Sequence, residues 1–173
     1  MPLGKTYSAA HWIDGDFSDD GVMVAAVAPS TGADIGKVAT GGRPQAEAAI
    51  AAAAYAFETS EWTQNLRLRA AMLFAAADRM EARAPELALL LAIETGKPIR
   101  AARGEIAGTI SETRYYAGLV RTVAGRMIEV EPGVYSLLAR EPAGLPGSSS
   151  HGTRLASCSF ARWHRRWRRV APW

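Results

Sequence analysis

The sequence reads Glu94-Thr95-Gly96-Lys97-Pro98 at the point where one predicted helix ends and another begins. Gly96 suits the left-handed conformation that often closes a helix, because glycine has no Cβ to collide with the backbone. Pro98 suits the first turn of the next helix, where the N–H that proline lacks would have no partner. We therefore predict a short apolar helix over residues 85–95 and a further helix that starts at Pro98.

Apolar residues recur every three or four positions on both sides of this junction, which is the spacing of an amphipathic helix. Pro44 opens the first predicted helix, and Thr63 is the predicted N-cap of the second. The predicted inward-facing positions are Ala46, Ala49, Ile50, Ala53 and Phe57 in the first helix, Leu66, Ala70, Leu73, Ala77, Met80 and Ala84 in the second, and Ala102, Ile106, Thr109, Thr113, Tyr116, Val120 and Val123 in the last. The middle of the chain is thus predicted to be a helical cluster.

Strand patterns precede this cluster. Asp14-Gly15 predicts a tight hairpin within residues 11–17, because this dipeptide favours the turn that joins two short antiparallel strands. Residues 22–28 and 35–39 predict two more strands, separated by the turn signal Pro29-Ser30-Thr31-Gly32. Together they predict a small antiparallel β unit at the N-terminus.

A second hairpin is predicted after Gly125. Residues 127–130 and 134–140 read as two strands, and Pro132-Gly133 supplies the turn between them. The predicted fold of the chain is therefore mainly α, with an N-terminal β unit and a C-terminal β-hairpin.

The net charge of +3 is divided unevenly along the chain. Residues 1–144 hold 14 Lys and Arg against 17 Asp and Glu, whereas residues 145–173 hold six Arg and no acidic residue. The latter segment also holds three of the five tryptophans and the only cysteine, Cys158. Two stretches of different composition therefore meet near Gly144.

The composition excludes several classes of protein. A single cysteine excludes an internal disulfide framework and is typical of the reducing cytoplasm, where we expect the protein to be located. No apolar run approaches the roughly 18 residues that a membrane span needs. Residues 1–16 lack the apolar segment of a signal peptide. We therefore expect neither membrane insertion nor export.

Polar residues of the N-terminal β unit do not form a convincing site in the sequence. Asp14 and Asp16 flank Gly15, which is more typical of a turn than of an acid/base pair. His11 and Trp12 have no Cys, His or carboxylate at metal-ligand spacing. These residues are therefore predicted to have packing or surface roles.

The helical cluster gives no site either. A catalytic role for Glu94 or Lys97 needs a partner at hydrogen-bonding distance, which the sequence does not identify. Gly104 and Gly108 are predicted to allow close helix packing, since their surroundings match no phosphate-binding loop. No serine or cysteine in residues 1–144 has the context of a nucleophile elbow. We predict no catalytic, cofactor-binding or metal-binding residue.

Several strings in one order resemble the opening of the NAD(P)-dependent aldehyde dehydrogenase superfamily. They are Trp12-Ile13-Asp14-Gly15-Asp16, Ala28-Pro29-Ser30-Thr31-Gly32 with Ile35-Gly36-Lys37-Val38, the alanine-rich helix before Trp62 and the helix with Arg67 and Arg69, Glu94-Thr95-Gly96-Lys97-Pro98, and Arg140-Glu141-Pro142-Ala143-Gly144. No single string is specific, but their shared order is. The resemblance covers residues 11–144.

The resemblance implies an α/β family with a Rossmann-like fold. Residues 1–125 would form the N-terminal part of the cofactor-binding domain, and residues 126–144 the hairpin of an arm through which the family forms homo-oligomers. The intact family oxidises aldehydes to carboxylic acids with NAD or NADP. Its oxyanion asparagine, in a Pro-Trp-Asn string, its catalytic cysteine and its general-base glutamate would follow Gly144, and Cys158 lacks the family's surrounding motif. We therefore expect the fragment alone to bind no cofactor and to be inactive.

Residues 145–173 match nothing in the family as they stand, but they permit its continuation in another reading frame. If the third base of each codon is joined to the first two bases of the next, residues 145–153 permit Ala-Gly-Ile-Ile-Val-Pro-Trp-Asn. Trp163 followed by His164 can give only alanine, and Trp167 followed by Arg168 gives alanine with the CGN codons of a GC-rich gene. Loss of one base near the codons for Gly144 and Leu145 would explain a tail that is out of frame, and we expect this tail to be disordered.

Two other functions stay open. Helices and hairpin edges without their family partners would form a non-catalytic interaction fragment. Alternatively, the arginines of residues 162–169, interleaved with Trp163 and Trp167, would bind polyanions without sequence preference. We expect no specific nucleic-acid partner.

Overall fold

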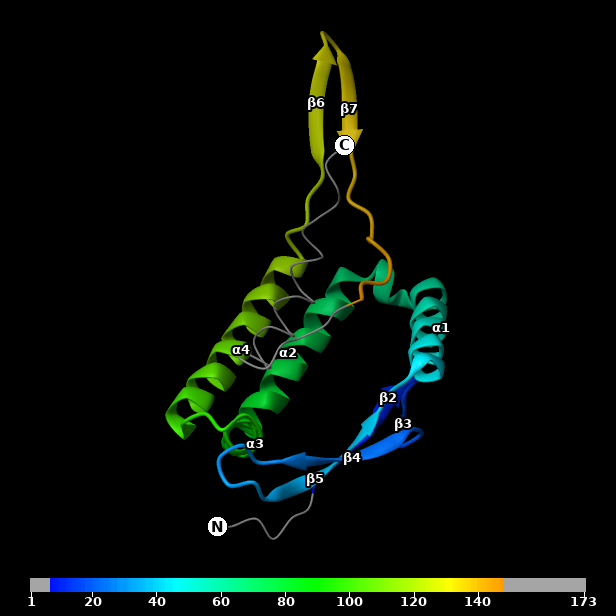
Figure 1. Ribbon diagram of the computed structural model, residues 1–173. Helices are drawn as coiled ribbons and strands as arrows, with labels where there is room; N and C mark the ends of the chain where they lie inside the picture. The colour runs from blue at the N-terminus through cyan, green and yellow to red at the C-terminus, as the bar shows by residue number, and fades with distance from the viewer. Residues whose placement is uncertain (1–6, 148–173) are drawn as a thin grey trace. The chain divides into compact units, whose positions relative to one another are not determined.

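The computed structural model describes residues 7–147, which fall into two compact units (Figure 1). Within this range the first unit contains residues 7–60 and 83–107, and the second contains residues 61–82 and 108–147. The prediction of a disordered tail over residues 145–173 lies almost entirely outside the described residues.

The first unit opens with a strand that the sequence pattern did not predict. β1 (Tyr7–Ala9) pairs in parallel with β5 (Asp34–Thr40), whose other edge pairs antiparallel with β4 (Val22–Val27). The predicted strands pair antiparallel as expected, but the unpredicted β1 makes this three-stranded sheet mixed, with the order β1-β5-β4. Gly36 allows β1 to approach, because a Cβ at this position would collide with the carbonyl group of Tyr7.

The predicted tight hairpin is confirmed. β2 (His11–Ile13) and β3 (Asp16–Ser18) pair antiparallel, so that Trp12 lies opposite Phe17. The two turn residues between them have positive φ, 53° at Asp14 and 87° at Gly15, as a two-residue turn between twisted strands requires. The rings of Trp12 and Phe17 meet edge to face with centroids 4.6 Å apart.

Helix α1 (Arg43–Thr59) follows the β unit and departs from the prediction in its burial. Pro44 lies in its first turn as expected, and the Gly42 N–H donates to Gln45 Oε1 at 2.9 Å. No residue of α1 is buried, however, and Ile50 of the predicted inward stripe is 63% exposed. Of the predicted inward residues of α1 only Phe57 is half-buried and the other four are exposed, so the prediction of this stripe as the covered face is wrong.

The rest of the first unit contains α3 (Ala84–Thr95) and the first turns of α4 (Ile99–Val120). Gly96 closes α3 with φ 71°, in the left-handed conformation predicted for it. Pro98 precedes α4, and its carbonyl accepts hydrogen bonds from the N–H groups of Ala101 and Ala102. The buried apolar side chains of this unit are Ala28, Ile35, Ala39, Ala88, Leu91, Ala102 and Ile106.

The second unit is built on α2 (Leu66–Ala82), which a short 3-10 helix, η1 (Glu61–Thr63), precedes. The prediction that Thr63 caps α2 is wrong. Asn65 is the N-cap, because its Oδ1 accepts a hydrogen bond from the Leu68 N–H at 2.9 Å and thus satisfies a donor of the first turn. Thr63 is two residues too early to reach that donor.

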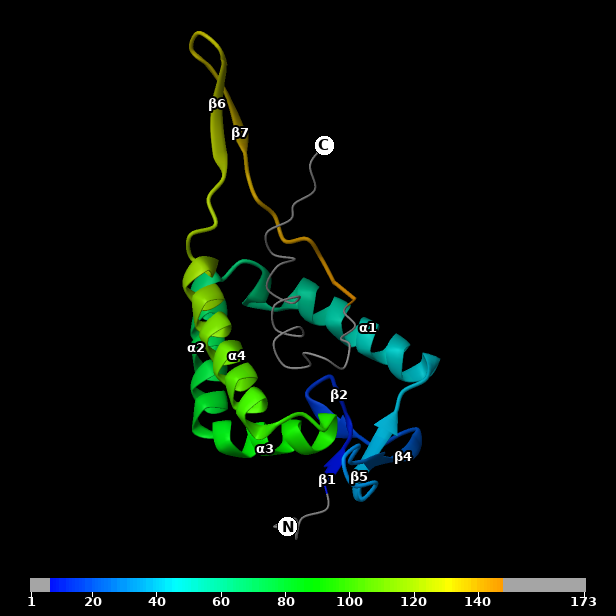
Figure 2. The same cartoon turned by 60° about the vertical axis from the view of Figure 1, so that its left-hand side comes forward.

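The predicted stripes of α2 and α4 meet in the core of the second unit, and Figure 2 shows the later part of α4 running beside α2. The buried residues here are Ala70, Leu73, Ala77, Thr109, Ile110, Thr113 and Ala117, with the Arg69 side chain. Thr109 and Thr113 are fully buried, and the Thr113 hydroxyl donates to the Thr109 carbonyl at 2.7 Å. Val123, predicted to face inward, lies beyond the end of α4 and is exposed.

The second unit ends in the predicted hairpin. β6 (Arg126–Glu131) and β7 (Val134–Leu138) pair antiparallel, and the register shifts between Glu129 and Glu131. Gly133 supplies the positive φ of the turn, 81°, and its N–H donates to Glu129 Oε1 at 2.8 Å. Every residue of both strands is exposed.

The described residues are thus mainly helical, with an N-terminal β unit and a C-terminal hairpin, as predicted. None of the helices within residues 7–147 is both long enough and apolar enough to span a bilayer.

Candidate functional site

The junction between α3 and α4 holds an ion pair that the sequence did not identify. Lys97 Nζ donates to Glu105 Oε2 at 2.6 Å, and the two side chains are only 16% and 10% exposed. Glu94, the other candidate of this stretch, is exposed. Lys97 therefore has the carboxylate partner that a catalytic role would need. The same ion pair also links the loop after α3 to the second turn of α4, so a purely structural role explains it equally well.

The turn that contains Pro29 and Ser30 contacts the junction between α3 and α4 at Gly96. A Cβ built at this position would lie 3.4 Å from Pro29 Cβ and 4.0 Å from the Ser30 nitrogen. The turn after β4 and the end of α3 are therefore in contact within the first unit, although about 65 residues separate them in the sequence. A glycine at this position satisfies both the left-handed φ and this close approach.

The polar residues of the β2–β3 hairpin do not assemble a site. Asp14 and Asp16 are exposed and flank the turn, as predicted. The His11 Nε2 atom is buried without a hydrogen-bond partner, and a Cβ built at Gly21 or Gly41 would lie close to this imidazole. Within the stretch that the structure covers, no three His, Cys, Asp or Glu side chains are grouped so that they could hold a metal ion.

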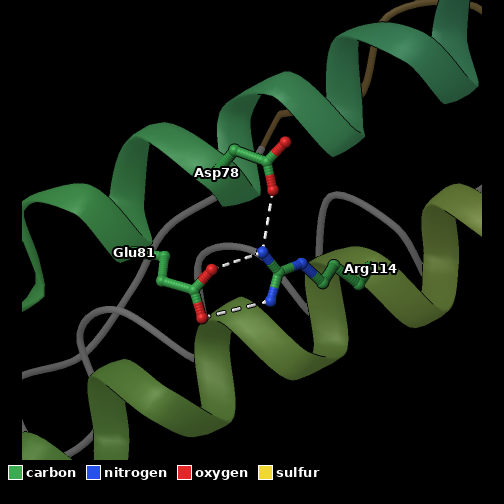
Figure 3. A network of polar contacts seen from close by, with 3 residues as sticks. All are labelled: Asp78, Glu81 and Arg114. Atoms are coloured by element: carbon green, nitrogen blue, oxygen red, sulfur yellow. Dashed lines mark hydrogen bonds and ion pairs between the residues drawn. The ribbon is translucent and has the colours of Figure 1, made fainter.

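A polar network joins α2 to α4 in the second unit (Figure 3). Arg114 Nη2 donates to Asp78 Oδ1 at 2.7 Å and to Glu81 Oε2 at 2.6 Å, and Nη1 reaches Glu81 Oε1 at 3.3 Å. The hydrogen bond from Arg114 holds the pKa of the Glu81 carboxyl below its usual range, and the carboxylates raise the pKa of Arg114. Because two carboxylates share one guanidinium, Arg114, Asp78 and Glu81 form a clamp between α2 and α4. The clamp is not the pair of groups with well-separated pKa values that acid/base catalysis uses.

The β6–β7 hairpin presents the largest group of exposed apolar side chains on neighbouring strands. These side chains are Met127, Ile128, Val130, Val134, Tyr135, Leu137 and Leu138. They are distributed over both faces of a two-stranded ribbon, which is the pattern of strands covered on both sides. This surface is the strongest candidate for function in the described residues, and its chemistry is that of protein association.

The strands do not form the unit that holds a dinucleotide in doubly wound sheets. That unit needs two parallel strands joined by a helix, with a glycine-rich turn at the helix start. The parallel pair found within residues 7–147 is β1 with β5, and the connection between them contains β2, β3 and β4, but no helix. The strand-helix-strand unit that holds a dinucleotide is therefore not found among the described residues.

The comparisons with known proteins agree on one family. Residues 17–148 match the model of the "Aldehyde dehydrogenase family". A (Z)-2-((N-methylformamido)methylene)-5-hydroxybutyrolactone dehydrogenase of Acinetobacter baylyi is 35% identical over 136 residues, which are 78% of this chain and 28% of that protein. The NADP/NAD-dependent aldehyde dehydrogenase PuuC of Escherichia coli is 37% identical over 121 residues, 69% of this chain and 24% of that protein.

Solved structures extend the similarity to the fold. The crystal structure of PnpE in complex with nicotinamide adenine dinucleotide superposes with a TM-score of 0.67 at 33% identity, over 72% of this chain and 26% of that one. The architecture of residues 7–147 is thus part of an α/β, Rossmann-like aldehyde dehydrogenase fold. The chain spans about a quarter of the length of each of these proteins.

Proposed function

The chain belongs to the aldehyde dehydrogenase family, and we propose that it is the front part of an NAD(P)-dependent enzyme that oxidises aldehydes to carboxylic acids. The order of the matching strings supports this position in the family. Residues 1–125 would be the N-terminal part of the cofactor-binding domain, and residues 126–144 the hairpin of the oligomerisation arm. The fully exposed apolar ribbon of β6 and β7 supports the second assignment.

The chain alone is proposed to be inactive. The reaction of the intact family needs a cysteine thiolate to attack the carbonyl, an acceptor for hydride and a carboxylate to activate water. We assign none of these roles within residues 1–173, because no residue stands in the family's motif for them. The absence of a strand-helix-strand unit from residues 7–147 supports the same proposal for cofactor binding.

Residues 145–173 are proposed to be the family's next segment in the wrong reading frame. The observation that carries this proposal is the coincidence of two boundaries. The family match ends at residue 148, and the charge changes after Gly144 from an acidic excess to six Arg without an acid. A cytoplasmic location is part of the proposal and is supported by the single cysteine.

An activity assay on three versions of the gene tests the proposal. The unaltered 173-residue chain should reduce neither NAD nor NADP with a panel of aldehydes. One base inserted at codons 144–145 should restore turnover, whereas two bases inserted at the same place should not. Aldehyde-dependent reduction of NAD or NADP by the unaltered chain would contradict the proposal. A one-base insertion that leads to an early stop codon would contradict it as well.

A second candidate function rests on the charge of residues 145–173, which is +6 from arginine alone. Such a segment binds polyanions through counterion release, so the affinity should fall steeply with salt for DNA, RNA and heparin alike. Filter binding in a salt titration separates the candidates. Preference for one nucleic-acid sequence or structure would favour a selected binding function over an out-of-frame segment.

A further inference from the structure

The sequence contains two Asp-Gly dipeptides, Asp14-Gly15 and Asp20-Gly21. The backbone nitrogen that follows an aspartate can attack the Cγ atom of that aspartate and close a five-membered imide ring. A glycine after the aspartate favours this attack, because it has no Cβ to hinder the nitrogen and its backbone rotates freely. Both dipeptides are therefore chemically able to react, and the structure around each one decides how readily it does.

The Asp14-Gly15 dipeptide lies in an open turn. Both residues are exposed, and a Cβ built at Gly15 would meet nothing within 4 Å outside its immediate neighbours in the chain. The two strands that this turn joins have three residues each, and their side chains nearest the turn include Trp12 and Phe17, which are 62% and 76% exposed. A short two-stranded hairpin with exposed side chains at its tip opens readily, because few contacts must be broken.

The backbone of Asp14 also favours opening of the turn. Its φ of 53° lies in the left-handed region, which costs free energy for a residue that has a Cβ. To bring the Gly15 nitrogen over Asp14 Cγ, the chain must leave this conformation, and leaving it removes that cost. The turn can therefore reach the geometry of ring closure without disturbing the buried residues of the first unit.

The Asp20-Gly21 dipeptide is held in place instead. Gln45 Nε2 donates to the Asp20 carbonyl at 3.4 Å. Gly21 packs so closely against β5 that a Cβ at this position would collide with the Thr40 carbonyl group. The next residue, Val22, begins β4, and its carbonyl accepts a hydrogen bond from Thr40 Oγ1 at 2.7 Å. The Gly21 nitrogen cannot move over Asp20 Cγ without breaking these contacts.

We propose that Asp14 is a site of spontaneous isomerisation to isoaspartate. The Gly15 nitrogen attacks Asp14 Cγ, an N–Cγ bond forms, and the hydroxyl group of the protonated carboxyl leaves with the amide proton as water. Water then opens the imide ring. Cleavage of the new N–Cγ bond restores aspartate, whereas cleavage of the bond between the Asp14 main-chain carbonyl carbon and the Gly15 nitrogen leaves the backbone routed through Cγ. Water is released and taken up again, so that no other reactant is needed.

Isoaspartate at residue 14 would change the β2–β3 hairpin. The backbone gains one CH₂ group, and a two-residue turn matches its strands only at its defined length. The pairing of Trp12 with Phe17 would therefore be lost or shifted. The product also presents an isoaspartyl α-carboxylate at the surface. The class of enzyme that would act on this site is a carboxyl methyltransferase that recognises isoaspartate and uses S-adenosylmethionine.

Peptide mapping of the aged chain tests the site. The folded 173-residue chain is incubated in mildly acidic buffer, and isoaspartate is quantified at residues 14 and 20 by electron-transfer fragmentation. We expect at least about five times more isoaspartate at residue 14 than at residue 20, because only the first dipeptide lies in an open turn. In a chain unfolded in urea the two yields should agree within about twofold, because neither dipeptide is then held.

Three results would overturn the proposal. They are equal yields in the folded chain, an excess at residue 20, and no isoaspartate in the folded chain. An excess at residue 14 that persists unchanged in urea would also overturn it, since the excess would then come from the neighbouring residues in the sequence and not from the open turn.

Matched variants test the same chemistry. Asp14→Glu would require a less favourable six-membered ring and should lower methyl incorporation by an isoaspartyl methyltransferase at least about fivefold, whereas Asp20→Glu should change it less than about twofold. Asp14→Asn keeps the turn, because Asn-Gly favours the same conformation, and should raise isoaspartate formation at least about fivefold, since ammonia replaces water as the leaving group. Unchanged incorporation in Asp14→Glu, or a larger loss in Asp20→Glu, would refute the assignment. None of these measurements depends on aldehyde oxidation or on the reading frame, so this inference and the proposed function fail separately.

Discussion

Helices α1 and α2 have the same length, 17 residues, but differ completely in burial. α2 buries Ala70, Leu73 and Ala77 together with Arg69, whereas no residue of the more alanine-rich α1 is buried. The predicted apolar stripes of the two helices follow the same three-and-four spacing. Composition and spacing therefore do not explain the difference, which comes from what each helix meets.

α2 meets the later part of α4 within its own unit. Thr109, Thr113 and Ala117 of α4 are fully or almost fully buried there, and Arg114 reaches back to α2. Within the first unit α1 has no such neighbour to bury it, and the chain spans only 28% of its Acinetobacter baylyi relative. We expect the cover of α1 to be supplied by the family segments that follow residue 144. An amphipathic stripe therefore predicts which face of a helix can be buried, but not whether another element is present to bury it.

The largest expected effect is a difference in unfolding free energy between substitutions in α2 and in α1. Leu73→Ala on α2 should lower the free energy of unfolding by about 3 kcal/mol, because Leu73 is 5% exposed and its loss leaves a cavity. Ile50→Ala on α1 should change it by less than about 0.5 kcal/mol, because the side chain is largely exposed. Urea unfolding followed by circular dichroism measures both. Equal losses for the two variants would contradict the difference in burial between α1 and α2.

The helix caps offer a smaller contrast. Asn65→Ala removes the side chain that caps α2 and should cost about 1 kcal/mol. Gln45→Ala removes the bond to the Gly42 N–H before α1 and should cost only about 0.3 kcal/mol, because an exposed terminus can bond water instead. The same urea titration applies. Thr63→Ala separates the two cap assignments for α2, and a loss as large as that of Asn65→Ala would restore Thr63 as the cap.

The smallest contrast is electrostatic and depends on pH. Arg114 lowers the pKa of Glu81, so its stabilisation of the α2–α4 pair is present above the ordinary carboxyl range and is lost as the pH falls below about 5. Arg114→Met should therefore lower the urea midpoint at pH 7 and make it less sensitive to pH between 7 and 3. Arg43→Met removes the exposed Arg43–Glu47 pair of α1 and should leave both unchanged. Parallel pH profiles for all three proteins would refute the role of the clamp.

Much of the fold could be predicted because its signals are local. The Asp14-Gly15 turn, the left-handed Gly96 and the Pro98 helix start each depend on residues within a few positions of one another. The inward face of α4 followed from spacing alone and is confirmed at Ala102, Ile106, Thr109 and Thr113, whereas Ile110 and Ala117 are buried without having been predicted. The family resemblance followed from the order of such local strings.

The features that the sequence did not predict depend on partners far away in the chain, or on a choice between two residues that suit the same position. β1 was missed because its partner, β5, is about 29 residues away and the pairing is parallel. Arg114 pairs with acids 33 and 36 positions away, and nothing in the sequence singles them out among 17 acidic residues. Thr63 and Asn65 are both good cap residues, and the choice between them depends on where the preceding 3-10 helix ends.

The proposed change of frame after Gly144 can be read directly from the nucleotide sequence of codons 144–153. If residues 11–144 are the front part of an aldehyde dehydrogenase whose continuation is out of frame, translation from the third base of the Leu145 codon should give Ala-Gly-Ile-Ile-Val-Pro-Trp-Asn. Codons that in this frame encode an unrelated sequence, or that contain a stop, would contradict the change of frame.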